Sequence, residues 1–188
     1  LRSFFVLLPM LLSFFVPALT MRLFSEEAKS GSLETLMTLP VNEVHVVTGK
    51  FLASFISTLI MISPSIFYVI TTAIFGDPDF GPIIGGYVGT IFLCAGFTAV
   101  GVFASAVTKN QIIAFFTGFI ICISLTMIDT FLVFLPSSIV EFVSYISADM
   151  HFTSITQGII DSRDLVYFIT LFALFFTATI KVQQNAKK

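Results

Sequence analysis

Five long apolar runs, separated by short polar segments, constrain the fold of this chain more than any other feature of its sequence. They cover residues 4–21, 51–75, 83–107, 112–135 and 165–180. A bilayer core about 30 Å thick is crossed by roughly 20 residues of helix, and these runs approach or reach that length. They lack the alternation of membrane β-strands, so helices remain the way to satisfy their backbone in lipid. The sequence therefore predicts an all-α integral membrane protein, a polytopic helical bundle with five transmembrane helices.

Composition supports this interpretation. Of the 188 residues, 56% are hydrophobic and 11% are charged, whereas soluble domains have about 25% charged residues. A domain of this size cannot bury so much apolar surface, so the lipid bilayer is its first expected partner. Cys94 and Cys122 both lie in apolar runs, and we interpret them as buried small hydrophobic residues. The sequence has no basic patch suited to nucleic acid.

Prolines and glycines predict bends and close contacts within the runs. Pro9 and Pro17 interrupt the first run, and Pro64 predicts a kink in the second. In the third run, Gly85 and Gly89 form a GxxxG pair, and such small residues let two helix backbones approach closely. This pair fits packing within one chain and also fits a dimer interface, and the sequence leaves both interpretations open.

The distribution of Lys and Arg predicts the orientation in the membrane. If each run crosses the bilayer once, segment 22–50 and the tail from Lys181 share one side, and segment 136–164 lies on the other. The first side carries Arg22, Lys29, Lys50, Lys109, Lys181, Lys187 and Lys188. The second side carries only Arg2 and Arg163. Because basic residues favour the cytoplasmic side, 22–50 and the C-terminus are predicted to be cytoplasmic and 136–164 extracytoplasmic.

The polar segment 22–50 is interpreted as three helical pieces with two breaks. Gly31 ends the first piece, and Ser32 is expected to cap a short second helix. Apolar residues at spacings of three and four give that helix one narrow stripe, formed by Leu33, Leu36 and Met37. Pro40 ends the short helix, and Asn42 is expected to cap the helix that enters the second run.

Two roles fit this short helix. Helices that rest on lipid headgroups usually carry Lys and Arg on the polar face, but the one charge here is Glu34. Docking onto a cytoplasmic protein fits that charge pattern better.

The same segment resembles the signature loop of type 2 ABC export permeases, the branch with gliding-motility (GldF-like) and NosY-like permeases. The family core reads M-R-L-F-x-E-E-x-x-x-G-[ST]-x-E-x-L-x-T-L-P-V and is followed by G-K. The residues of this chain that match it are Met21, Arg22, Leu23, Phe24, Glu26, Glu27, Gly31, Ser32, Glu34, Leu36, Thr38, Leu39, Pro40, Val41, Gly49 and Lys50. Residues 151–168 are similar to the motif that precedes the last span of the family.

The resemblance implies a single permease domain over residues 1–188, with a cytoplasmic coupling loop at 22–50 and an extracytoplasmic helical segment at 136–164. The family usually has six spans, so the chain is expected to be an N-terminally truncated fragment with the last five. The loop is implied to dock on a separate ATP-hydrolysing subunit. The expected coupling residues are Glu26, Glu27, Gly31, Ser32, Leu33, Glu34, Leu36, Met37, Leu39 and Pro40.

The resemblance also implies the assembly and its location. Two permease subunits, identical or different, would join two ABC ATPase subunits in the bacterial cytoplasmic membrane, and an accessory extracytoplasmic subunit is a further expected partner. ATP and Mg are expected on the ATPase, because a phosphate-binding loop needs G-x-x-x-x-G-K-[ST]. The one Gly-Lys pair, Gly49-Lys50, has Val44 in place of the first glycine and Phe51 in place of Ser or Thr. The chain is therefore expected to be no enzyme itself and to hold no cofactor.

The resemblance implies that the chain is the permease subunit of an ATP-driven transporter, which moves an unidentified substrate across the cytoplasmic membrane. The alternative is a membrane anchor or scaffold of a motility or envelope complex that the ATPase switches without net transport. Asp129 in the fourth run is costly in lipid and fits either structural pairing or a place on a transport path. An ion-coupled transporter would need a midplane cluster of ionisable residues, which Asp129 alone does not provide.

The extracytoplasmic segment is predicted to hold two short amphipathic helices within 139–160. Ser162 is expected to cap the last span, with Asp164 in its first turn. His151 follows Asp149 and Met150, but with no second cluster of ligands this is a weak indication of a metal site.

Overall fold

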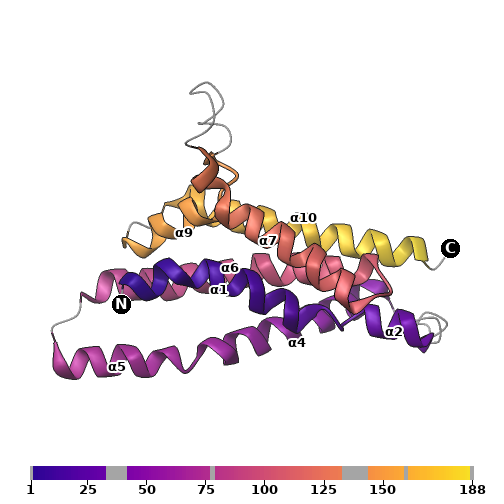
Figure 1. Ribbon diagram of the computed structural model, residues 1–188, viewed down its shortest axis with the longest axis horizontal. Helices are drawn as coiled ribbons and strands as arrows, with labels where there is room; N and C mark the ends of the chain where they lie inside the picture. The colour runs from indigo at the N-terminus through magenta and orange to yellow at the C-terminus, as the bar shows by residue number, and fades with distance from the viewer. Residues whose placement is uncertain (1, 33–41, 77–78, 133–143, 159–160, 187–188) are drawn as a thin grey trace.

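The computed structural model describes residues 2–32, 42–76, 79–132, 144–158 and 161–186, and the regular elements within these ranges are α-helices (Figure 1). They are α1 (Arg2–Thr20), α2 (Ser25–Ser30), α4 (Glu43–Ile62), α5 (Ser65–Phe75), α6 (Phe80–Val107), α7 (Gln111–Leu132), α9 (Ala148–Thr156) and α10 (Ser162–Ala186). The predicted all-α fold is confirmed.

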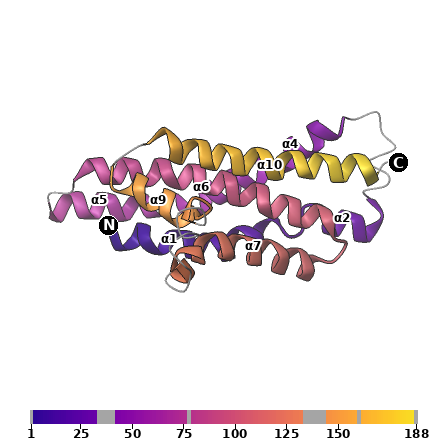
Figure 2. The ribbon, with the colours of Figure 1, turned by 90° about the horizontal axis from the view of Figure 1, so that it is seen from above.

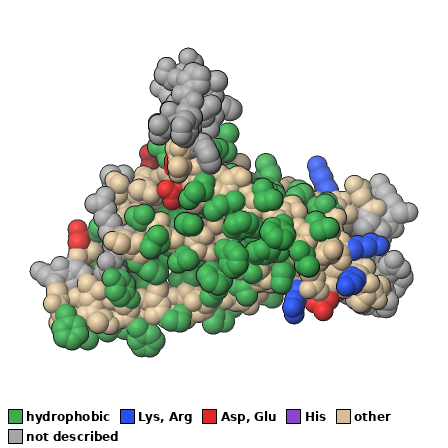
Figure 3. Space-filling model, viewed as in Figure 1, with side chains coloured by type: hydrophobic (Ala, Val, Ile, Leu, Met, Phe, Trp, Pro, Cys, Tyr) green, Lys and Arg blue, Asp and Glu red, His purple; other side chains and the backbone are tan. Residues whose placement is uncertain are grey.

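Five helical stretches are long and apolar enough to cross a membrane. They are Ser3–Ser30, Glu43–Phe75, Phe80–Val107, Gln111–Thr130 and Ser162–Asn185. They match the five predicted runs in order. In Figure 3, hydrophobic side chains cover the body of the molecule, and Lys and Arg gather at the end where α2 and the C-terminus lie. The Lys and Arg residues that the sequence assigns to one side of the membrane thus gather at one end of the bundle.

The two prolines of the first run do not interrupt its helix. Pro9 and Pro17 both lie inside α1, which continues from Arg2 to Thr20. Transmembrane helices tolerate proline when neighbouring groups satisfy the backbone. One face of α1 is buried in the core at helical spacing, through Phe5, Leu8, Leu12 and Val16.

The second run bends at the predicted position. Helix α4 ends at Ile62, and α5 begins at Ser65, directly after Pro64. Beyond the bend, α5 buries none of its side chains and diverges from α6 (Figure 1). Two of its side chains contact other helices. The Ser65 hydroxyl lies 2.9 Å from the Tyr87 hydroxyl of α6, and the Tyr68 ring contacts the Phe4 ring of α1.

Helix α6 is the centre of the bundle and packs against α1, α4, α7, α9 and α10 (Figure 2). Near the start of α6, a Cβ on Gly85 would collide with the carbonyl oxygen of Ile155 in α9. A Cβ on Gly89 would lie 3.2 Å from the Ile155 side chain. The GxxxG pair therefore packs within the chain, against α9, which favours the first of the two interpretations of this pair.

We expect Gly85→Ala to lower the free energy of unfolding by about 1–3 kcal/mol, because the new methyl group would push α9 from α6. Thermal unfolding in detergent measures the change. Gly49→Ala is the matched control, since Gly49 is also helical and has nothing within 4 Å of an added Cβ. The control should unfold at the same temperature or slightly higher, because Ala favours helix over Gly. Equal melting temperatures for Gly85→Ala and the unsubstituted protein would contradict this packing.

Candidate functional site

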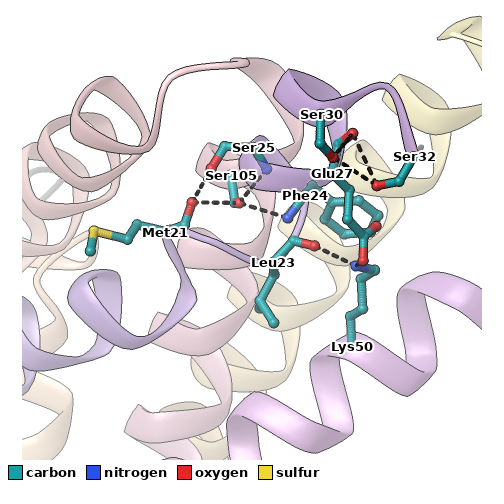
Figure 4. Close-up of polar contacts among 9 residues, drawn as sticks. All are labelled: Met21, Leu23, Phe24, Ser25, Glu27, Ser30, Ser32, Lys50 and Ser105. Carbon is teal, nitrogen blue, oxygen red and sulfur yellow. Dashed lines mark hydrogen bonds and ion pairs between the residues drawn. The ribbon is translucent and has the colours of Figure 1, made fainter. Parts of the chain in front are cut away.

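The first turn of α2 is capped by a side chain from another helix. The first N–H groups of a helix have no partner within it, and the N-cap residue Phe24 has no side chain that could accept them. The Ser105 hydroxyl of α6 accepts from the Phe24 N–H at 3.0 Å and from the Ser25 N–H at 3.2 Å. It also donates to the Met21 carbonyl at 2.9 Å (Figure 4). One hydroxyl with a donor and two acceptor positions thus fixes α2 to α6.

Lys50 of α4 holds the other side of α2. Its Nζ lies 2.6 Å from the Glu27 Oε1, donates to the Leu23 carbonyl and lies 4.7 Å from the centre of the Phe24 ring (Figure 4). An ammonium group over an aromatic face is attracted by the ring quadrupole. The Lys50 side chain is 17% exposed, so water screens these contacts less than it would on an open surface.

A small apolar cluster lies beneath these polar contacts. Phe24, Val47 and Val102 are at most 2% exposed and join the end of α1–α2 to α4 and α6. Phe176 and Ile180 of α10 pack against the same cluster. A displacement of α2 must therefore break these contacts or carry the ends of three spans with it.

At its far end α2 stops where the sequence predicts. Gly31 takes the left-handed conformation, φ 75°, that ends many helices and favours glycine. The Ser32 hydroxyl lies 2.9 Å from the Ser30 hydroxyl and donates to the Glu27 carbonyl at 3.4 Å. The short helix that Ser32 was predicted to cap lies outside the described residues. The predicted cap of the following helix is confirmed, because the Asn42 side chain accepts from the Val44 N–H at 3.0 Å.

The structure places only some of the predicted coupling residues. Glu27 pairs with Lys50, the Glu26 side chain is exposed, and Gly31 and Ser32 form the end of α2. The other predicted coupling residues, which lie outside the described ranges, are Leu33, Glu34, Leu36, Met37, Leu39 and Pro40.

Sequence reasoning did not assign roles to Lys50 and Ser105. Lys50 belongs to the Gly-Lys pair of the family core, and a lysine at the edge of an apolar run is a signal that could have indicated a partner. Ser105 lies among small residues of the third run, and nothing in the sequence marks it as a cap for a helix 80 residues away.

Asp129 lies near the end of α7 that contacts α9. Its Oδ2 accepts the Ser147 hydroxyl at 2.7 Å, and Ser147 in turn caps α9 by accepting from the Met150 N–H at 3.3 Å. Burial, and next the negative charge of Asp129, raise the pKa of the Asp149 carboxyl. Asp129 thus makes a structural pairing, and its place on a transport path stays a prediction.

The cap of the last span differs from the predicted one. The Asp161 carboxylate accepts from the Arg163 N–H at 3.1 Å, so Asp161 caps α10 instead of Ser162. A carboxylate is an equally good cap. Asp164 lies in the first turn of α10, as predicted, and bonds to His151 of α9. Across the described part of the chain, no group of three or more His, Cys, Asp or Glu residues is arranged to hold a metal ion.

A family model described as "ABC-2 family transporter protein" matches residues 1–181. No curated protein and no solved structure matches the chain significantly.

We expect Ser105→Ala to loosen the start of α2, because two N–H groups and one carbonyl would lose a buried partner at about 1–3 kcal/mol. Hydrogen exchange followed by mass spectrometry should show faster exchange of the amides of Phe24 and Ser25. Ser57→Ala is the matched control, since the Ser57 hydroxyl is exposed and bonds only to the Ala53 carbonyl of its own helix. Unchanged exchange in Ser105→Ala would show that the α6 hydroxyl does not hold α2.

Proposed function

The chain belongs to the ABC-2 family of transporter proteins, and on that premise we propose that it is a permease subunit driven by a separate ABC ATPase subunit. It would move its substrate across the bacterial cytoplasmic membrane. The signature loop supports a place in the gliding-motility and NosY-like branch of the family. The observation that carries the proposal is the attachment of α2 to α4 and α6 through Lys50 and Ser105, at the basic end of the bundle.

The proposed coupling loop, 22–50, is where the ATPase would act. Its described part is fastened at both ends: α2 to α6 and α4, and Asn42 into the first turn of α4. The rest of the loop, residues 33–41, lies outside the described residues. It would carry the apolar stripe of Leu33, Leu36 and Met37 to a groove on the ATPase. A displacement of this segment would therefore reach the spans in two ways, through α2 and directly through the start of α4.

The mechanism follows from differential binding. Closure of the ATPases around ATP would bind one position of the coupling loop better than the other and shift the population of the spans toward that state. Phe24, just before α2, packs with Val47 of α4 and Val102 of α6, and through this apolar cluster α2 would carry both spans along.

The proposed assembly has two permease subunits and two ATPase subunits. ATP and Mg would bind to the ATPase, since the sequence here departs from a phosphate-binding loop at Val44 and Phe51. An accessory subunit would meet the extracytoplasmic segment 136–164.

Orientation is tested by labelling single cysteines in a background that lacks Cys94 and Cys122. Ser30 and Met150 are both exposed and lie at opposite ends of the bundle. In intact cells we expect a membrane-impermeant maleimide to label Met150→Cys and to label Ser30→Cys only after permeabilisation. The reverse pattern would overturn the assignment of the coupling loop to the cytoplasm.

Docking is tested by replacing Leu36 and Met37 together with Asp. Two charges without partners in an apolar groove should cost several kcal/mol, enough to weaken binding about a hundredfold. We expect the variant to insert into the membrane but no longer to co-purify with an ATP-hydrolysing subunit from solubilised membranes.

Lys109→Asp is the control for charge, because it changes the net charge of the cytoplasmic side by the same amount as the double variant. It should retain the ATPase. Full ATPase binding by the Leu36/Met37 variant would mean that the short helix rests on lipid headgroups, and the docking role would be dropped.

A further inference from the structure

The extracytoplasmic helix α9 is fastened to three spans. It packs on the glycines of α6, and the Asp129 carboxylate of α7 accepts the hydroxyl of its cap residue Ser147. From α10, the Tyr167 hydroxyl donates to the Ile146 carbonyl at 2.6 Å, just before α9 begins. These contacts hold α9 across the outer ends of α6, α7 and α10, where Figures 1 and 2 both place it.

A histidine–carboxylate pair also links α9 to α10. The His151 Nδ1 lies 2.6 Å from the Asp164 Oδ1, and the Nε2 lies 3.2 Å from the Tyr145 carbonyl oxygen. Both ring nitrogens thus face acceptors, while a neutral imidazole carries a single N–H. The geometry is complete only with one extra proton, either as imidazolium and carboxylate or as imidazole and carboxylic acid.

Because the pair is buried, its stability depends on this proton. His151 is 9% exposed and Asp164 is 6% exposed, so water provides little compensation for a charge. The His151 ring stacks on the Tyr167 ring with 4.3 Å between centres. Among the described residues the Asp164 Oδ2 has no hydrogen-bond partner. Loss of the proton would leave a buried carboxylate facing a neutral ring, and an uncompensated buried charge is strongly unfavourable.

Solvent can reach the edge of the pair. A hollow of about 450 Å³ opens beside it and is lined by Ser144, Tyr145, Met150, His151, Ser154, Asp161, Arg163 and Asp164. The titratable or charged groups near the pair are Tyr167 and Arg163 of α10, Asp161 just before α10, and Tyr145 just before α9. Asp149, on the same helix as His151, interacts with Asp129 of α7, and α6 meets α9 through its glycines.

We propose that His151 and Asp164 form a proton-dependent clamp that holds α9 across the outer end of the bundle and releases it when the proton is lost. The pair binds the proton more fully at lower pH, so α9 is held there and loosens as the pH rises. The clamp goes beyond the proposed transport function and requires no ATPase.

The clamp is tested by the reactivity of a buried cysteine under α9. Ile155→Cys places a thiol at a fully buried position against α6, and Met150→Cys places one at a position that is 49% exposed on the same helix. Both are made in a background without Cys94 and Cys122. The maleimide reacts with the thiolate, so the labelling rate at Ile155→Cys is divided by that at Met150→Cys to remove the pH dependence that the two thiols share. We expect this ratio to rise about tenfold between pH 6 and pH 9, which corresponds to about 1.4 kcal/mol.

Two variants of the pair give opposite expected results. His151→Phe keeps the ring stacked on Tyr167 but holds no proton, so the ratio should be high at both pH values. Asp164→Asn can donate an amide N–H to the Nδ1 of a neutral His151, whose Nε2–H still serves Tyr145, so the ratio should be low at both.

A third variant separates the clamp from its neighbours. Asp149→Asn removes the carboxylate that faces Asp129 and should leave the pH dependence of the ratio unchanged. A ratio that does not change with pH in the unsubstituted pair would overturn the clamp, and so would a pH dependence that persists in His151→Phe or Asp164→Asn.

Discussion

In a bilayer, a backbone N–H or C=O group without a partner costs several kcal/mol, and this constraint shapes the whole molecule. It makes each apolar run a helix, and it moves the difficulty to the helix ends. There the chain satisfies the free groups with polar side chains from other helices. Ser105 serves the start of α2, and Ser147, held by Asp129, serves the start of α9. The side chains that close helices also join them.

Helix α6 connects the two ends of the bundle. Its small residues admit α9 near the start of α6, at Gly85 and Gly89, and admit α1 near the other end, where a Cβ on Gly101 would collide with Thr20. Ser105, one turn further along, holds α2. Because packed interiors transmit displacement instead of absorbing it, a shift of α2 has a direct structural route along α6 to α9.

The two ends differ in the kind of charge that fastens them. At the proposed cytoplasmic end, Lys50 bonds to Glu27 and to the Leu23 carbonyl, and its ammonium group supplies all the donors for these contacts. At the opposite end, His151 bonds to Asp164 and faces the Tyr145 carbonyl, and a neutral imidazole has a single N–H for these two acceptors. The attachment at α9 therefore depends on one further proton, whereas the attachment at α2 does not.

The sequence by itself determined the five spans, the bend at Pro64, the end of α2 at Gly31 and the cap at Asn42, because each depends on local hydropathy or local backbone chemistry. It also indicated the family, through a signature loop of contiguous residues. Only the tertiary structure decided the partners of Ser105, Lys50 and His151. Each bonds to a group on another element, and local sequence patterns carry no information on which helices become neighbours. The structure also decided between the two interpretations of the Gly85–Gly89 pair, since small residues permit close approach but do not specify which helix approaches.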